Sequence, residues 1–232
     1  MEIRQFRYSS DNLSYLLYDK TSALAIDAGA VEALLAFVSK QRLKLEFVTN
    51  THLHPDHTVG NKAVLEQSGA KYLDNNTLLE KGKIRLGREE ITVYHTPGHT
   101  EDSVCFHCGN ILITGDTLFN GTVGNCFSGD IKAFFESAKL LASFPPETIV
   151  YAGHDYIKES MFFAKYVDPD NKEIDLFLEK YDPNHVCSTL AEEFKINPYL
   201  RFNDEKMAAI LKKRGLSVKT EYDRWKSLMA LD

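Results

Sequence analysis

The sequence predicts an α/β fold in which β-sheets pack together under covering helices, followed by a small domain made only of helices. Up to about residue 156, short β-type runs alternate with runs of helical periodicity, which is the pattern of layered α/β architectures. After about residue 157 the strand signal vanishes. A length of 232 residues suits one domain of about 150 residues with a smaller appendage. We therefore expect a first domain over residues 1–157 and a second over residues 158–232.

The strands of the first domain are short runs rich in Leu, Ile, Val and Tyr that end at Asp, Gly or Asn. They are expected over residues 12–19, 22–29, 45–52, 89–98, 103–108, 110–119 and 148–156. Two runs with apolar residues at helical spacing, 30–43 and 130–144, predict helices on the sheets, and Asp130 is placed to cap the second.

The second domain contains four runs of helical periodicity. They cover residues 156–167, 172–181, 189–194 and 204–215. Thr189 and Glu192 have the spacing of a capping box, which predicts that a helix begins at this point.

Charge and composition exclude several classes of partner. The chain has 33 acidic and 27 basic residues, and its longest basic block is LKKRG at residues 211–215, whereas proteins that track phosphate backbones carry a basic face. No apolar run approaches the ~18–20 residues of a membrane span. The first residues lack a signal-peptide pattern, and the four cysteines form no dense framework. We expect a cytoplasmic monomer that acts on a small molecule, without nucleic-acid or membrane partners.

The segment THLHPDHTVG, residues 51–60, concentrates three histidines and one aspartate. A protein core cannot hold several unpaired imidazoles cheaply, so the cluster suggests metal binding. Three more candidate ligands each stand in the turn after a β-type run, where loop residues of a layered fold converge. Together these ligands suffice for two metal ions, with zinc first and iron or manganese possible. The candidates are His52, His54, Asp56, His57, His99, Asp116 and His154.

This pattern resembles the metallo-β-lactamase superfamily, whose hallmark is T-H-x-H-x-D-H followed by isolated His, Asp and His. The resemblance implies an αβ/βα sandwich with a dinuclear site at one edge. Asp27 in "AIDAG" fits the superfamily's first motif, a carboxylate behind the ligands. The implied ligand sets are His52, His54 and His99 for one metal, and Asp56, His57 and His154 for the other, with Asp116 bridging.

Three further segments look like glyoxalase II, the hydroxyacylglutathione hydrolases. They are TGDTLF (114–119), GHDY (153–156) and STLAEEFKINPYLR (188–201), the last within the helical domain that this family adds to the sandwich. The implied reaction is hydrolysis of S-lactoylglutathione, or of a related thiol-carrier thioester, to the acid and the thiol. Two ions about 3.5–4 Å apart lower the pKa of a shared water from ~15.7 towards ~7. The metal ligands would be the catalytic machinery, with Asp56, Asp116 and His54 foremost.

The expected substrate site departs from the family's pattern. The family places a lysine and a tyrosine on the glycine carboxylate of glutathione, and Asn125 and Phe127 stand at those positions here. Lys219 and Tyr222 stand in place of a C-terminal arginine and lysine, and only Tyr156 matches directly. Neither Asn125 nor Tyr222 supplies the charge-assisted bond that a carboxylate prefers. We expect these five residues at the substrate site, with loose binding of glutathione thioesters or a different thiol carrier.

Two alternatives remain on the same scaffold. A sulfur (persulfide) dioxygenase would use one iron on His52 or His54, His99 and Asp116, but that branch lacks the helical tail. A hydrolase of another ester or lactone would keep both metals.

Overall fold

The first sheet is formed by the N-terminal part of the chain in the computed structural model, which describes residues 1–231. Its strands lie in the order β1 (Glu2–Arg7), β2 (Leu13–Tyr18), β3 (Ser22–Ile26), β4 (Lys44–Thr49) and β5 (Lys71–Tyr72). The pairs β1–β2 and β2–β3 are antiparallel, whereas β3–β4 and β4–β5 are parallel. The parallel pairs require crossovers, and helices α1 (Val31–Lys40) and α3 (Asn61–Ser68) supply them.

The second sheet has six strands in the order β13-β12-β9-β8-β7-β6. They are β6 (Lys83–Leu86), β7 (Glu89–His95), β8 (Val104–Cys108), β9 (Ile111–Gly115), β12 (Ile149–Ala152) and β13 (Ser188–Thr189). Strands β6 to β9 form an antiparallel meander, and β12 lies parallel to β9. Between these two come the small hairpin β10 (Leu118–Phe119) and β11 (Thr122–Val123) and helix α5 (Ile131–Ala142).

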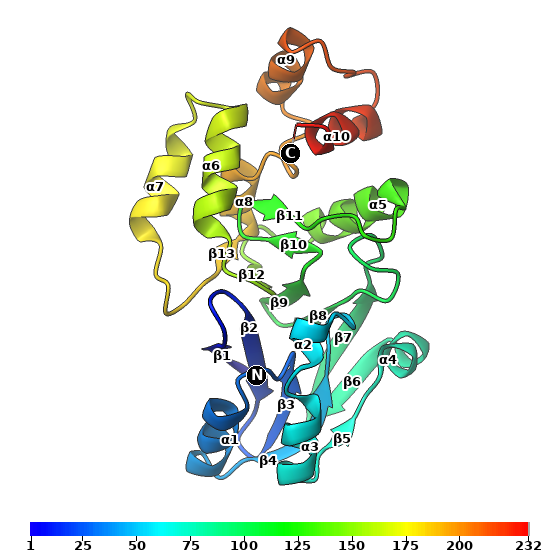
Figure 1. Ribbon diagram of the computed structural model, residues 1–232, viewed down its shortest axis with the longest axis vertical. Helices are drawn as coiled ribbons and strands as arrows, with labels where there is room; N and C mark the ends of the chain where they lie inside the picture. Colours follow the sequence, from blue (N-terminus) through cyan, green and yellow to red (C-terminus); the bar gives the residue numbers. More distant parts are fainter. Residues whose placement is uncertain (232) are drawn as a thin grey trace.

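The two sheets face each other and bury the central core between them. Strand alternation sends Leu13, Tyr15 and Leu17 of β2 into this core, against Phe106 of β8 and Ile113 of β9. The opposite face of the first sheet packs on α1 and α3, and the opposite face of the second packs on α5 and the C-terminal helices. Figure 1 shows the resulting helix–sheet–sheet–helix layers. The predicted αβ/βα sandwich is confirmed.

The C-terminal region is helical, as predicted, and its first helix begins at Ile157. It contains α6 (Ile157–Val167), α7 (Lys172–Lys180), α8 (Leu190–Ile196), α9 (Glu205–Lys213) and α10 (Glu221–Met229). Trp225 of α10 is fully buried against Phe134 and Phe135 of α5, so this region shares a core with the sandwich. Among the described residues, every helix falls short of what crossing a bilayer requires.

Local capping explains where several helices begin. The Asp130 carboxylate accepts a hydrogen bond from the Ala133 amide, 2.9 Å away, at the start of α5. Thr189 and Glu192 form the predicted capping box of α8. The prediction that strands end at residue 157 is wrong in one respect, because β13 pairs with β12 directly before α8. A two-residue strand is too short to leave a periodic signal.

Candidate metal centre

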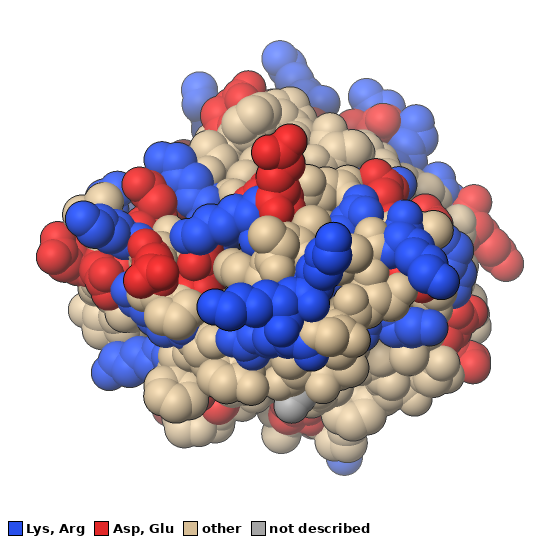
Figure 2. Space-filling model, turned by 90° about the horizontal axis from the view of Figure 1, so that it is seen from above, with Lys and Arg blue, Asp and Glu red and all other residues tan. Residues whose placement is uncertain are grey.

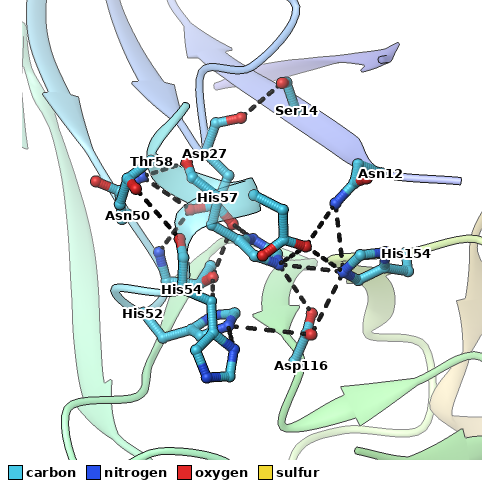
Figure 3. A network of polar contacts seen from close by, with 12 residues as sticks. Asn12, Ser14, Asp27, Asn50, His52, His54, His57, Thr58, Asp116 and His154 are labelled. Carbon is cyan, nitrogen blue, oxygen red and sulfur yellow. Dashed lines mark hydrogen bonds and ion pairs between the residues drawn. The ribbon is translucent and has the colours of Figure 1, made fainter. Parts of the chain in front are cut away.

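The predicted ligands come from four strand ends and one short helix at the same edge of the sandwich. Figure 3 labels His52, His54, His57, Asp116 and His154 among them. His52 follows β4, His99 follows β7, Asp116 directly follows β9 and His154 follows β12. The remaining ligands lie on or beside helix α2 (Pro55–Thr58), where proline at the first helical position favours the turn. The structure therefore brings all seven predicted ligands together.

The first group consists of His52, His54 and His99. Their ring nitrogens point at one another: His54 Nδ1 lies 2.9 Å from His52 Nε2 and 3.1 Å from His99 Nε2. The potential ligand atoms of this group all lie within 4.8 Å of one another. His52 and His99 are buried and His54 is partly buried, so the group faces the surface on one side only.

The second group consists of Asp56, His57 and His154. The Nε2 atoms of His57 and His154 are 3.2 Å apart, and Asp56 Oδ2 lies 3.7 and 3.3 Å from them, respectively. His57 is completely buried, whereas the Asp56 side chain is about half exposed, 48%. This group also fits within 4.8 Å.

Asp116 lies between the two groups. Its Oδ2 is 3.4 Å from His154 Nε2 and 3.6 Å from His99 Nε2, while its Oδ1 is 3.4 Å from His57 Nε2. Gly153 makes this approach possible, because a Cβ there would come within 2.1 Å of Asp116 Oδ1. A carboxylate in this position can reach ligands of both groups, which is the geometry that a bridging role requires.

The donor set fits divalent cations. Imidazole nitrogens of the cluster converge in pairs, and the buried Oδ1 of Asp116 has no hydrogen-bond partner among the described residues. Buried polar atoms are normally satisfied, so this oxygen, which faces the imidazoles, points to a partner of another kind. Five imidazoles and two carboxylates are the ligand types of zinc, iron and manganese.

Asp27 orients His57 from behind. Its Oδ2 accepts hydrogen bonds from His57 Nδ1 (2.9 Å) and from the Thr51 hydroxyl (2.7 Å), and its Oδ1 accepts from the Thr51 amide (2.8 Å). With Nδ1 engaged, Nε2 of His57 faces the ligand cluster. Asp27 has a φ of +52°, a left-handed backbone that places its carboxylate under the cluster.

The electrostatics of the cluster follow from burial and from close opposite charges. Burial opposes protonation of His57, but the carboxylates of Asp27 and Asp116 outweigh it and raise its pKa to about 11. Burial, together with His57, lowers the pKa of His52 to about 3. Burial acts to raise the pKa of Asp116, yet the close imidazoles of His154 and His57 hold it well below its usual range. A bound cation would compete with these protons for the same nitrogens.

Asn12 is a further member of the site that the sequence did not reveal. Its side-chain amide donates to Asp56 Oδ2 (2.9 Å) and lies 3.4 Å from His154 Nε2, and its backbone pairs with that of His154 (Figure 3). Tyr8 adds a hydrogen bond from its hydroxyl to the Asp56 carbonyl (2.8 Å). A single asparagine before a strand carries no recognisable signal, so only the structure places it here.

The predicted substrate residues separate into two places. Tyr156 stacks on His154 with ring centroids 4.9 Å apart, and the Asn125 carbonyl accepts a hydrogen bond from His99 Nδ1 (2.9 Å). Phe127 is 66% exposed and its ring lies edge-on to His54 and His99. Tyr222 instead packs against Phe135 of α5, and Lys219 is exposed just before α10. Their contact with substrate stays a prediction.

Comparison with known proteins assigns both parts of the chain to family profiles. Residues 10–73 and 71–154 match the profile of the metallo-beta-lactamase superfamily. Residues 155–230 match the profile described as the hydroxyacylglutathione hydrolase C-terminus.

Curated relatives carry the same description. Hydroxyacylglutathione hydrolases from Pelagibacter ubique and Brucella ovis are each 33% identical to this chain, over 227 and 235 residues. These alignments cover 88% and 91% of this chain and 95% and 90% of the relatives.

Solved structures share the architecture. ETHE1 from Myxococcus xanthus superposes with a TM-score of 0.72 at 25% identity, covering 100% of this chain and 92% of that one. TTHA1623, solved in a di-iron-bound form, gives a TM-score of 0.57 at 26% identity, covering 81% of this chain and 94% of that one.

Proposed function

Because the chain belongs to the hydroxyacylglutathione hydrolase family of the metallo-β-lactamase superfamily, and is therefore a metal-dependent thioester hydrolase, we propose that it cleaves S-(2-hydroxyacyl) thioesters of a thiol carrier. S-lactoylglutathione is the reference substrate. The observation that carries the proposal is the convergence of two three-residue ligand groups on Asp116. A thioester carbonyl at this cluster would lie next to the proposed metal ions, which would supply the attacking water and polarise the carbonyl oxygen.

We propose two zinc ions as the resident metals, with iron or manganese as the other ions that the donor set accepts. Bound there, divalent ions would supply a water of lowered pKa and a Lewis acid for the carbonyl oxygen. The ligands of the first ion would be His52, His54 and His99, and those of the second Asp56, His57 and His154, with Asp116 shared.

The chain's own contribution is to fix the ligands. The Nδ1 atoms of His57 and His99 are held by the Asp27 carboxylate and the Asn125 carbonyl, so each ring turns its Nε2 inward. Asn12 holds Asp56 by a hydrogen bond to Oδ2. This support fixes the ligand geometry before substrate arrives, which is how preorganised sites gain rate.

The leaving group needs little help from the protein. A thiol has a pKa near 8.5, so the departing thiolate is stable close to neutral pH without a strong general acid. Burial, followed by Asp11 and other acidic neighbours, raises the pKa of Tyr156 to about 12, so its hydroxyl stays protonated beside the cluster. We assign Tyr156 to hydrogen bonding with the substrate and no proton transfer to it.

A small molecule suits the surface better than nucleic acid does. Figure 2 shows basic and acidic side chains interleaved on the face formed by the C-terminal helices, with one compact basic group near its centre. The chain as a whole carries a net charge of −6. A nucleic-acid groove would present a continuous basic stripe. We propose a monomer that acts on a diffusing thioester.

The direct test combines metal analysis with hydrolysis of S-lactoylglutathione on the same sample. We expect up to two ions per chain and metal-dependent release of the thiol, lost on chelation and restored by zinc. A fully active sample without a transition metal, or a two-metal sample inert towards every thioester offered, would refute the proposal.

A single-iron persulfide dioxygenase is the second candidate. His99 Nε2 and Asp116 Oδ2 lie 3.6 Å apart and could hold one iron together with His52 or His54. Against it stands the match of residues 155–230 to the hydroxyacylglutathione hydrolase C-terminus. Oxygen uptake with a persulfide by an iron-loaded sample would favour the dioxygenase, whereas thiol release without oxygen uptake favours the hydrolase.

A further inference from the structure

A cavity of about 200 Å³ opens beside the ligand cluster, between the β10–β11 hairpin and helix α6. Its walls combine aromatic rings with short polar side chains. The lining residues are Phe119, Thr122, Val123, Asn125, Tyr156, Glu159, Ser160 and Phe163.

The cavity shares walls with both ligand groups. Tyr156 stacks on His154 of the second group. The ring of Phe119 packs edge-on to both, with ring centroids 5.1 Å from Tyr156 and 6.0 Å from His154. On the other side, Asn125 holds His99 of the first group through its backbone carbonyl. A substrate whose thioester lies at the cluster can therefore extend its thiol half into this cavity.

The polar groups of the lining are almost all uncharged. Asn125, Thr122, Tyr156 and Ser160 offer amide and hydroxyl groups, and the buried Ser160 hydroxyl has no hydrogen-bond partner among the described residues. The single charged residue of the lining is acidic, Glu159 in the first turn of α6. No lysine or arginine belongs to this lining.

The neighbouring cavity, about 500 Å³, contains two basic residues, Arg7 and Lys158, together with three acidic ones, Asp11, Asp155 and Glu159. It meets the first cavity at Tyr156 and Glu159. Its Arg7 is already bound to Asp155 and donates to the Pro183 carbonyl. Lys158 remains without an acidic partner in that lining, and both Asp11 and Glu159 face the same space.

We propose that Glu159 and the uncharged lining select a thiol carrier whose end remote from sulfur is a neutral, hydrogen-bonding group and not a carboxylate. This inference rests on the proposed thioesterase function and specifies its substrate class. An amide or hydroxyl end can both donate to and accept from Asn125 and the hydroxyl groups. In the first cavity a carboxylate would lose water, find no cation in the lining and lie near the like charge of Glu159, which is unfavourable.

The comparison that isolates this contact uses two substrates differing at one group. These are S-lactoylglutathione and the S-lactoyl thioester of glutathione whose glycine carboxyl is a primary amide, with the metal-loaded full chain. We expect KM to be about threefold to tenfold lower for the amide with kcat similar, because a remote contact acts as uniform binding. A wild-type chain that handles both equally, or prefers the free carboxylate, overturns the proposal.

Variants locate the effect. Glu159→Gln should reduce the difference in KM between the amide-ended and the carboxylate-ended thioester. Glu159→Lys should reverse it, so that the carboxylate-ended thioester has the lower KM. The matched control is Glu66→Lys, an exposed charge reversal on α3 outside both linings, which should leave the preference unchanged. If Glu159→Lys and Glu66→Lys shift it equally, long-range charge and not this cavity is responsible, and the assignment to Glu159 is wrong.

Equilibrium binding keeps the inference separate from the proposed function. The non-hydrolysable S-hexyl thioethers of glutathione and of its amide can be titrated by calorimetry. Turnover of both thioesters without a difference in binding defeats the inference alone. Absence of any turnover defeats the proposed function, and the binding ratio of the two thioethers still decides whether the cavity favours a neutral end.

Discussion

Two acidic side chains, Asp116 in the metal centre and Glu193 beneath the helical region, are almost completely buried in opposite surroundings. Asp116 faces imidazoles, which hold its pKa well below the usual range. Glu193 of α8 is fully buried without a cation, and burial raises its pKa to about 7 although several hydrogen bonds act against this. The carboxyl group of Asp116 is therefore kept charged, as a metal ligand must be. The carboxyl group of Glu193, which connects α8 to the β10–β11 turn, has a pKa near neutral pH.

The Glu193 carboxylate works through neutral donors. Its two oxygens accept from the Gly121 amide (3.1 and 3.0 Å), the Ser188 hydroxyl (2.6 Å) and the Asn197 side chain (2.8 Å). Gly121 lies in the turn between β10 and β11, and residues of these two strands line the cavity beside the metal centre. This carboxylate is buried and hydrogen-bonded without a counter-charge, so its role is structural. Its protonation should change the free energy of unfolding more than the catalytic rate.

Removal of the Asp116 carboxylate should have the largest effect. Asp116→Ala takes away the carboxylate that lies within reach of both ligand sets, so both ions should bind weakly and kcat/KM should fall by more than about 100-fold. Metal content and thioester hydrolysis measure this, with Asp170→Ala, an exposed aspartate, as control. A variant that keeps both ions and near-normal turnover would show that Asp116 does not bridge.

Glu193→Gln tests the other carboxylate through the pH dependence of stability. Because the pKa rises from 4.5 to about 7 on folding, the folded state binds more protons between these values. Wild-type stability should therefore fall as pH rises through this window, by at most about 3 kcal/mol. Glutamine does not titrate, so the variant should not lose this stability. The difference in free energy of unfolding between the two proteins should therefore change with pH.

Chemical denaturation from pH 5 to 8 with both proteins in the same metal state measures this difference. Glu205→Gln, an exposed position on α9, should run parallel to wild type. Parallel curves for Glu193→Gln as well would mean that Glu193 ionises normally in the folded protein, and the contrast with Asp116 would disappear.

Asp27 sharpens the comparison, because it is a buried carboxylate that acts on the metal centre only through His57. Asp27→Asn can no longer accept from both Thr51 and His57 as the carboxylate does. We expect metal affinity to fall about tenfold to 100-fold, the usual cost of losing such support. Chelator competition measures it, with Asp170→Asn as control. Unchanged affinity would mean that packing alone orients His57.

The sequence predicted the metal ligands far better than the buried hydrogen bonds around Glu193. Ligands at strand ends can be recognised in a sequence because metal binding restricts them to His and Asp, and because the fold brings strand ends to one edge. Glu193 reads as a solvated helix residue, and only tertiary packing buries it. Strand β1 was missed for a similar reason: as a half-exposed edge strand, it carries Ile3 and Phe6 but no apolar run. Asn12 likewise has no periodic or motif signal.

The smallest expected effect lies on the substrate side, where the chain departs most from its family. Asn125→Lys with Phe127→Tyr would add a cation and a hydroxyl at exposed positions, and the Asn125 carbonyl that holds His99 belongs to the backbone and is retained.

The double variant should lower KM for S-lactoylglutathione by up to about tenfold, equivalent to ~1.4 kcal/mol. It should leave kcat unchanged, because the added contacts bind ground state and transition state alike. The amide-ended thioester should gain little, since its glycine end has no carboxylate to pair with the new lysine. Steady-state kinetics on both substrates give the answer. A wild-type KM already in the low micromolar range and unmoved by the exchange would mean that glutathione's carboxylate binds elsewhere, and the substrate role of this loop would be wrong.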